Sequence, residues 1–240
     1  MRVEIWSDIA CPWCYIGKAR FEQGLEKFAH KDEIEVVYRS FELDPSLPKG
    51  TVSDVLPMLA KKYGMSLEQA KAAEGRVASN AHDSGLEYVF GAHDVGNTFD
   101  MHRLIHFAAE KGKQKDLVGV LFRNHFADER SLFDDERLIE LAVEAGLDAD
   151  EVRAVLADEN AYADAVRDDE REAAALGANG VPFFVMDRKY GISGGQPAEV
   201  FTQALEKAWE TYTPPVKLLT VVGAAPEDAV CGPDGCEIPA

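Results

Sequence analysis

The chain has 240 residues, which is enough for one large domain or for a domain that carries an insertion. Its 43 acidic and 25 basic residues give a formal net charge of -18 at pH 7. A field of this sign repels phosphate backbones and anionic membrane surfaces, so we exclude nucleic acid as a partner and expect no membrane association.

The first predicted elements are a strand over residues 3–7 and an amphipathic helix over residues 15–28, with a Cys-Pro-Trp-Cys motif at residues 11–14 between them. Pro12 fits the first helical position, because its missing N–H costs nothing there. Cys11 then becomes the N-cap, and its sulfur faces unpaired backbone N–H groups at the positive end of the helix dipole. This environment favours the thiolate, which is the species that attacks disulfides. A strand, a C-x-x-C pair and a helix in this order indicate a redox site.

Further along the chain, the pattern predicts a long helical block between two groups of strands. We predict a strand at 34–41, a loop at 43–50, helices through almost all of 51–176, strands at 181–186 and 190–193, and a helix that ends at Trp209. The order β-α-β, helical block, β-β-α predicts one α/β domain interrupted by a helical insertion.

Capping residues predict several helix ends inside the helical block. Such residues satisfy the backbone N–H or C=O groups that a helix end leaves unpaired. The signals are a capping box at Ser66 and Gln69, helix starts at Asn97 or Thr98 and at Asp148 or Asp150, and helix ends at Gly146 and Gly177.

Four stretches of the chain together resemble the DsbA-like branch of the thioredoxin-fold superfamily, and within it the FrnE type. The stretches, which occur in the order that the family has, are residues 7–17, 97–103, 180–184 and 194–197. The resemblance implies an α/β, thioredoxin-like fold with a large all-helical insertion and a C-terminal cysteine-containing tail. We divide the chain accordingly into a first thioredoxin-like part (1–50), the insertion (51–177), a second thioredoxin-like part (178–213) and the tail (214–240).

The resemblance also implies roles for individual residues. Cys11 carries over as the attacking thiol, Cys14 as the resolving thiol, and Pro182 as a cis-proline that faces them. A cis bond before proline costs little compared with any other cis peptide, and it leaves the backbone of Val181 exposed beside the sulfur. An extended substrate could pair with that backbone like an added strand. Taken alone, Pro182 would read as an ordinary strand-entry proline.

Two side chains join Val181 as candidates for substrate contact. Trp13 lies between the two cysteines, and the resemblance implies that His102 lies on the face of the insertion that covers the site. His102 and His106, at positions i and i+4, could instead share a metal ion. No acidic or cysteine ligand has matching spacing nearby, so we expect a satisfied or surface pair and no metal site.

A second cysteine pair, Cys231 and Cys236, lies in the tail, where we also expect one strand over residues 218–222. The Gly-Pro-Asp-Gly stretch between the two cysteines forms turns readily, so local disulfide closure costs little entropy. The resemblance implies a redox-active pair that relays electrons to or from Cys11 and Cys14. The alternatives are two idle thiols, or a zinc site built from all four cysteines. A pair at a helix start favours redox chemistry over zinc.

These features predict a cytosolic thiol–disulfide oxidoreductase or isomerase that acts on protein or small-molecule disulfides. The chain runs from Met1 straight into the first strand without an apolar leader, and no segment approaches the eighteen or so apolar residues of a membrane helix. In a reducing cytosol, disulfides are typically transient and catalytic. We expect no cofactor besides the redox disulfides, with glutathione as an optional thiol partner. The oligomeric state stays open.

Two other functions stay open at this point. Glutathione-dependent isomerases of the 2-hydroxychromene-2-carboxylate type and kappa-class transferases share the insertion architecture, and in that family a serine often stands where Cys11 stands here. The two cysteines of this chain argue against such an enzyme but leave glutathione binding open. A holdase chaperone would bind unfolded chains through an apolar groove near Trp13 and Pro182.

Overall fold

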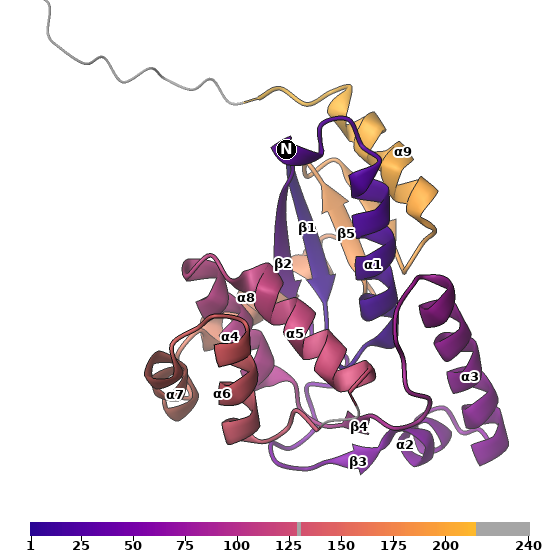
Figure 1. Cartoon of the computed structure of the whole chain (residues 1–240), viewed down its shortest axis with the longest axis vertical. Helices are drawn as coiled ribbons and strands as arrows, with labels where there is room; N and C mark the ends of the chain where they lie inside the picture. The colour runs from indigo at the N-terminus through magenta and orange to yellow at the C-terminus, as the bar shows by residue number, and fades with distance from the viewer. Residues whose placement is uncertain (129–130, 215–240) are drawn as a thin grey trace, which may run out of the picture.

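A central four-stranded sheet organises the computed structural model, which describes residues 1–128 and 131–214 (Figure 1). Its strand order is β2-β1-β5-β6. Strand β1 (Arg2–Ser7) runs parallel to β2 (Glu35–Ser40) and antiparallel to β5 (Phe183–Met186), and β6 (Tyr190–Ser193) pairs antiparallel with β5. The predicted order of strands and helices is confirmed. The predicted strand at 218–222 and both tail cysteines lie outside the described residues.

Helices α1 (Pro12–Glu26) and α9 (Ala198–Trp209) lie side by side against one face of this sheet (Figure 1). Three buried rings join them to β5: the centroid of Phe184 lies 5.5 Å from that of Phe21 and 4.6 Å from that of Phe201. Rings at these separations gain stabilisation beyond that of their buried area. This packing fixes the start of α1 relative to the start of β5.

The segment between β2 and β5 is mainly helical, as predicted. Its helices are α2 (Val55–Lys62), α3 (Leu67–Asp83), α4 (Phe99–Glu110), α5 (Gln114–Phe126), α6 (Asp135–Glu144), α7 (Ala149–Ala157) and α8 (Ala163–Ala175). A short 3-10 helix at Lys31–Glu33 lies outside this segment, just before β2. The capping box at Ser66 and the helix starts at Thr98 and Asp148 are confirmed. The boundary residues proposed for the insertion stay predictions. No helix in the described ranges is both long and apolar enough to cross a membrane.

One small sheet in the helical segment was not predicted. Strands β3 (Ser53–Asp54) and β4 (Asp94–Val95) pair antiparallel, and each has only two residues. So short a strand shows no alternation of apolar and polar residues, and its partner lies far along the chain. The prediction that helices fill almost all of 51–176 is therefore wrong at these two strands and in the loop that leads to β4.

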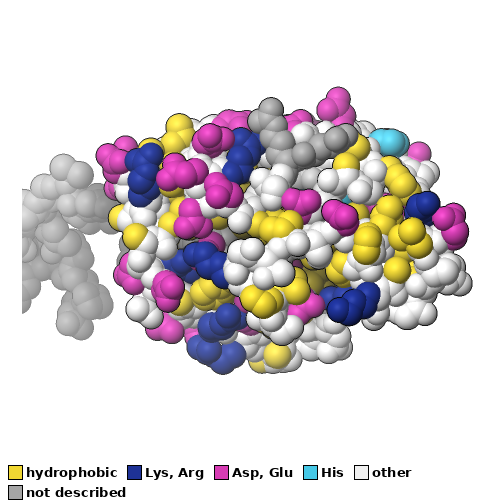
Figure 2. Space-filling model, turned by 90° about the horizontal axis from the view of Figure 1, so that it is seen from below, with side chains coloured by type: hydrophobic (Ala, Val, Ile, Leu, Met, Phe, Trp, Pro, Cys, Tyr) yellow, Lys and Arg dark blue, Asp and Glu magenta, His cyan; other side chains and the backbone are white. Residues whose placement is uncertain are grey.

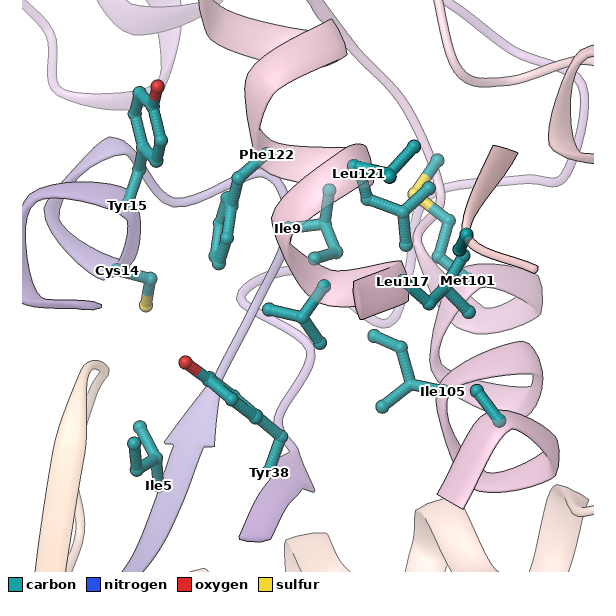
Figure 3. Close-up of a cluster of buried hydrophobic side chains, with 14 of the residues drawn as sticks. Ile5, Ile9, Cys14, Tyr15, Tyr38, Met101, Ile105, Leu117, Leu121 and Phe122 are labelled. Atoms are coloured by element: carbon teal, nitrogen blue, oxygen red, sulfur yellow. The ribbon is translucent and has the colours of Figure 1, made fainter. Parts of the chain in front are cut away.

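The helical segment and the sheet share one hydrophobic core rather than two separate ones. Figure 3 shows Tyr38 of β2 and Cys14 of α1 facing side chains of α4 and α5, among them Ile105 and Leu121. The ring of Tyr15 stacks on two phenylalanines of α5, Phe122 and Phe126, at centroid distances of 5.7 and 5.6 Å. The insertion therefore supports the start of α1 directly.

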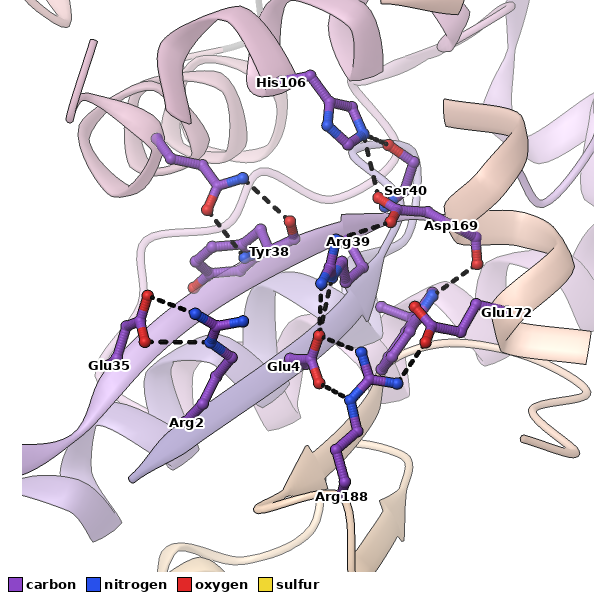
Figure 4. Close-up of polar contacts among 12 residues, drawn as sticks. Arg2, Glu4, Glu35, Tyr38, Arg39, Ser40, His106, Asp169, Glu172 and Arg188 are labelled. Carbon is purple, nitrogen blue, oxygen red and sulfur yellow. Dashed lines mark hydrogen bonds and ion pairs between the residues drawn. The ribbon is translucent and has the colours of Figure 1, made fainter. Parts of the chain in front are cut away.

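A charged network ties helix α8 to strands β1 and β2 (Figure 4). The buried carboxylate of Glu4 accepts hydrogen bonds from Arg39 at 3.0 Å and from Arg188 at 2.7 Å. Asp169 of α8 accepts from Arg39 at 3.1 Å and from the backbone N–H of Ser40 at 2.8 Å. Every buried charge here has a partner, which buried charges require. Neither Cys11 nor Cys14 takes part in this network.

Candidate active site

The cysteine motif has the local geometry that its sequence predicts. Cys11 is the N-cap of α1 with an extended backbone (φ -96°, ψ 110°), and Pro12 occupies the start of the helix. The N–H of Cys14 donates to the carbonyl of Cys11 at 3.0 Å, and the N–H of Cys11 donates to the carbonyl of Asp8 at 3.1 Å. The turn after β1 therefore delivers the Cys11 thiol to the free end of the helix.

The two thiols are unbonded and buried, but their surroundings differ. Cys11 lines a cavity, whereas Cys14 is not part of its wall and faces the core (Figure 3). Burial raises the pKa of Cys14 well above its ordinary value, and the adjacent Cys11 thiol raises it further. The pair thus consists of one thiol at a surface cavity and one sheltered thiol that ionises reluctantly.

The bond between Val181 and Pro182 is cis, as predicted. The thiol of Cys11 donates a hydrogen bond to the carbonyl of Val181, with 3.6 Å between sulfur and oxygen. The carbonyl of Pro182 accepts from the N–H of Gly194 at 2.8 Å, so the glycine pair after β6 holds the proline loop. Gly194 has φ +80°, a left-handed conformation that favours glycine.

A cavity of about 390 Å³ opens beside Cys11. Its floor comes from the motif and from Val181, and its walls come from the loop after β2, from α2 and α3, and from the segment around β4. The lining residues are Asp8, Ala10, Cys11, Pro12, Trp13, Leu43, Asp44, Leu47, Val55, Met58, Leu59, Lys62, Tyr63, Ala73, Glu74, Val77, His93, Val95, Gly96, Thr98 and Val181. Its volume falls in the range of small-molecule and peptide side-chain pockets.

His102 lies behind the cavity rather than on its wall. It is 2% exposed, and its Nε2 lies 3.3 Å from Oδ1 of Asp8, which does line the cavity. Burial by itself would raise the pKa of Asp8, but the hydrogen bond and charge of His102, together with the N–H of Leu43 at 2.7 Å, outweigh it and lower that pKa. The structure therefore makes His102 a support for Asp8. Trp13 and Val181 line the cavity, and the substrate contacts proposed for all three residues stay predictions.

The two histidines at i and i+4 have separate partners, as expected for a satisfied pair. His106 Nε2 lies 3.0 Å from a carboxylate oxygen of Asp169, on the side of the sheet network, while His102 faces Asp8. Within residues 1–128 and 131–214, no group of three or more His, Cys, Asp or Glu side chains is arranged to hold a metal ion.

Sequence reasoning missed a polar group on the α3 wall. Glu74 is 2% exposed, accepts a hydrogen bond from the hydroxyl of Tyr88 at 2.7 Å, and lies 3.8 Å from Nδ1 of His93. Glu74 and His93 both line the cavity. Neither belongs to a motif, and only the fold brings α3 and the β4 segment to the cysteines. Asp8 had a weak signal, because it lies three residues before Cys11, where the turn between β1 and α1 begins.

Comparison with known proteins agrees with this architecture. A crystal structure of a probable DsbA oxidoreductase from Streptomyces coelicolor is 62% identical in sequence, with 100% of each chain covered and a TM-score of 0.86. The cytosolic disulfide reductase DsbM from Pseudomonas aeruginosa is 19% identical over 88% of this chain and 100% of that chain, with a TM-score of 0.60. A 2-hydroxychromene-2-carboxylate isomerase is 16% identical over 88% of this chain and 97% of that chain, with a TM-score of 0.65. The last two show a common fold.

The sequence also matches a known protein over a short stretch and a domain family over most of its length. A stretch of 46 residues is 37% identical to the uncharacterized protein YwbO of Bacillus subtilis, and it spans 19% of this chain and 21% of that protein. The sequence profile of the DSBA-like thioredoxin domain family matches residues 2–206, which include the motif, the helical segment and the cis-proline. The chain therefore belongs to the DSBA-like thioredoxin domain family, a family of thiol–disulfide oxidoreductases.

Proposed function

We propose that the protein is a cytosolic thiol–disulfide oxidoreductase in which Cys11 attacks and Cys14 resolves. The observation that carries the proposal is the asymmetry of the pair: Cys11 lines the cavity beside Val181, and Cys14 is sheltered. Only a thiol at the cavity can reach the sulfur of a bulky substrate. A sheltered thiol with a raised pKa stays protonated until the first step has occurred.

The reaction has two exchange steps. The Cys11 thiolate attacks one sulfur of the substrate disulfide, so a bond forms between the two molecules, and the other substrate sulfur leaves as a thiolate that takes up a proton. Cys14 then loses its proton and attacks the sulfur of Cys11. The intramolecular disulfide forms, the mixed disulfide breaks, and the substrate leaves fully reduced. Two thiols of the cellular pool reduce the pair again, and the reverse sequence oxidises a dithiol.

Substrate docks on the backbone next to Pro182. Val181 precedes β5, whose pairing with β6 begins at Phe183, so its peptide groups lie at the open end of the sheet. An extended chain that pairs there would place a cysteine opposite Cys11. Trp13, which is 38% exposed, covers the adjacent side of the substrate.

We assign the cellular compartment and the source of electrons by analogy with a protein that shares the fold. DsbM is a cytosolic disulfide reductase, and its structure with GSH, 17% identical to this chain with a TM-score of 0.55, supports a thiol pool as the source of electrons. A relay through Cys231 and Cys236 stays a prediction from the sequence, because both lie outside the described residues.

Trapping of the mixed disulfide tests the proposal. Reduced Cys14→Ser protein should form a stable covalent adduct with a disulfide-bonded peptide, and mass spectrometry should place it on Cys11. The matched control, Cys11→Ser, should form no such adduct, although it keeps one motif thiol. An adduct on Cys14 in the control at a rate similar to that of Cys11 would show that the assignment of the two roles is wrong.

A further inference from the structure

The walls of the cavity are apolar over most of their area. Leu43, Leu47, Val55, Met58 and Leu59 line it beside Cys11. Figure 2 shows the face of the molecule that includes α2 and α3, and hydrophobic side chains gather on it. Burial of an apolar side chain of the substrate in this cavity would stabilise the complex.

Among the described residues that line the cavity, the cationic side chains are few, and the one lysine lies beside a carboxylate. Lys62 is the single lysine, and its Nζ lies 3.6 Å from Asp44, which also lines the cavity. No arginine is among the lining residues. Burial lowers the pKa of His93 below its ordinary value of 6.5, so its ring is neutral at pH 7.

The buried carboxyl group of Glu74 lines the same cavity, next to His93. Glu74 accepts hydrogen bonds from the hydroxyl of Tyr88 and from the N–H of Gly91 at 3.4 Å, and its neighbour His93 does not supply a charge. In a wall shielded from water, a negative group repels another one more strongly than it would in solvent. A substrate with carboxylates beside its sulfur therefore meets repulsion without a compensating ion pair.

We propose that the cavity selects polypeptide disulfides whose cysteine lies among apolar and uncharged or basic residues, and that it discriminates against acidic disulfides, glutathione disulfide included. This inference rests on the proposed function of Cys11. The occupant is a polypeptide because apolar side chains continue outside the cavity: Leu43 and Tyr63 line it and are nevertheless 41% and 62% exposed. A small disulfide would leave this rim uncovered.

A charge series of disulfides tests the selectivity. The symmetrical disulfides of three peptides, acetyl-Leu-X-Cys-X-Leu-amide with X as Lys, Gln or Glu, are mixed with reduced protein at low ionic strength, next to glutathione disulfide and the small dication cystamine. Each second-order rate is divided by that of dithiothreitol with the same disulfide, which removes differences in intrinsic reactivity. We expect the Lys peptide to react at least about tenfold faster than the Glu peptide, with glutathione disulfide and cystamine also slower than the Lys peptide.

Two variants assign the effect to the cavity. Glu74→Gln keeps an oxygen that accepts from Tyr88 but removes the negative charge, and Asp44→Asn releases Lys62 from its partner. Both should narrow the gap between the Lys and Glu peptides several-fold. Glu206→Gln makes the same change in net charge on an exposed position of α9, away from the cavity, and should leave the gap unchanged.

The outcomes separate this inference from the proposed function. Equal normalised rates across the series, or a gap that Glu206→Gln narrows as much as Glu74→Gln, would overturn the selectivity while leaving the chemistry of Cys11 intact. Cystamine as fast as the Lys peptide would overturn the polypeptide occupant. Wild-type rates no higher than those of Cys11→Ser for every disulfide would overturn the function itself, and the inference with it.

Discussion

Gly17 of α1 lies against the ring of Pro182, so closely that a Cβ at residue 17 would come within 2.9 Å of the proline Cγ and 3.3 Å of Gly195 Cα. Real Cβ atoms do not approach a neighbour at the shorter distance, so any side chain at residue 17 must push the proline loop away from the helix. The distance between Cys11 and Val181 is therefore controlled partly from the second turn of α1.

Gly17→Ala should reduce disulfide exchange beyond its effect on stability. We expect a loss of about 1–3 kcal/mol in the free energy of unfolding, as for overpacking elsewhere, together with a fall of several-fold in turnover per folded molecule. Urea unfolding and the rate of insulin reduction measure the two. The matched control is Gly24→Ala, whose Cβ would meet the carbonyl of Ala198 at 2.5 Å but lies away from the proline. Equal losses of turnover per folded molecule in the two variants would show that the contact between Gly17 and Pro182 has no special effect on disulfide exchange.

The two thiols should react with iodoacetamide in a fixed order. Cys11 lines the cavity, and burial raises the pKa of Cys14 well above its ordinary value, so Cys14 lacks both access and thiolate. We expect labelling of Cys11 to be at least about tenfold faster at neutral pH, as measured by mass spectrometry of the digested protein. Unfolding in urea should remove the difference. Faster labelling of Cys14 in the folded protein would reverse the proposed roles.

Asp8→Asn should destabilise the fold more at neutral pH than at acidic pH. The pKa of Asp8 is lower in the folded protein than its ordinary value of 3.8, so on acidification the unfolded chain takes up this proton first. The stabilisation is complete at pH values well above 3.8, the pKa in the unfolded chain, and is lost as the pH falls through the lower pKa of the folded state. We expect a cost of about 1–3 kcal/mol at pH 7, because the amide cannot accept from both His102 and Leu43 as the carboxylate does. Chemical unfolding at pH 7 and near pH 3.5 should show that the difference in the free energy of unfolding between the wild type and Asp8→Asn is smaller at the lower pH. Glu206→Gln should have the wild-type free energy of unfolding at both pH values.

His125 should make the protein sensitive to mild acid. Burial, followed by the charge of His93, lowers its pKa to about 3, and neither ring nitrogen has a hydrogen-bond partner among the described residues. The unfolded chain therefore binds this proton from about pH 6.5 downward while the folded chain does not, so stability is full above pH 6.5 and falls toward pH 3. The expected loss between pH 7 and 5 is about 2 kcal/mol.

Replacing this histidine with leucine gives the test. His125→Leu should be neutral or stabilising at pH 7, because no hydrogen bond to a described residue is lost. Its free energy of unfolding should fall less than that of the wild type between pH 7 and 5. An unchanged slope in His125→Leu would assign the acid sensitivity to another group.

The sequence predicted the parts of the site that depend on local structure. Cys11 at the helix start follows from Pro12 and from the helical pattern after it, and those residues are adjacent in the chain. The cis-proline came from the resemblance and is confirmed, while the catalytic roles of the pair stay a prediction. Local physics and a recognised motif thus located the reacting atoms.

The rest of the site depends on contacts that no local pattern encodes. His102 and Asp8 are 94 positions apart, and the polar wall at Glu74 forms only when α3 packs beside the motif. Helical periodicity shows which residues of α3 are apolar, but it does not show which element covers them. For this reason the sequence placed His102 over the site, whereas the structure puts it behind Asp8.

Strand β1 lies between β2, which follows it closely in the sequence, and β5, which is synthesised much later. Val3 pairs with Val36 of β2 on one side and with Met186 of β5 on the other. During synthesis the cysteine motif therefore leaves the ribosome well before β5 can complete the sheet around it, and such distant pairing is slow. Until then Cys11 has neither Val181 nor a finished cavity wall beside it. A chain halted before residue 183 would carry the thiol pair and most residues of the cavity wall, but not the strand that holds Val181 beside Cys11. The docking edge is therefore completed only with the last part of the sheet.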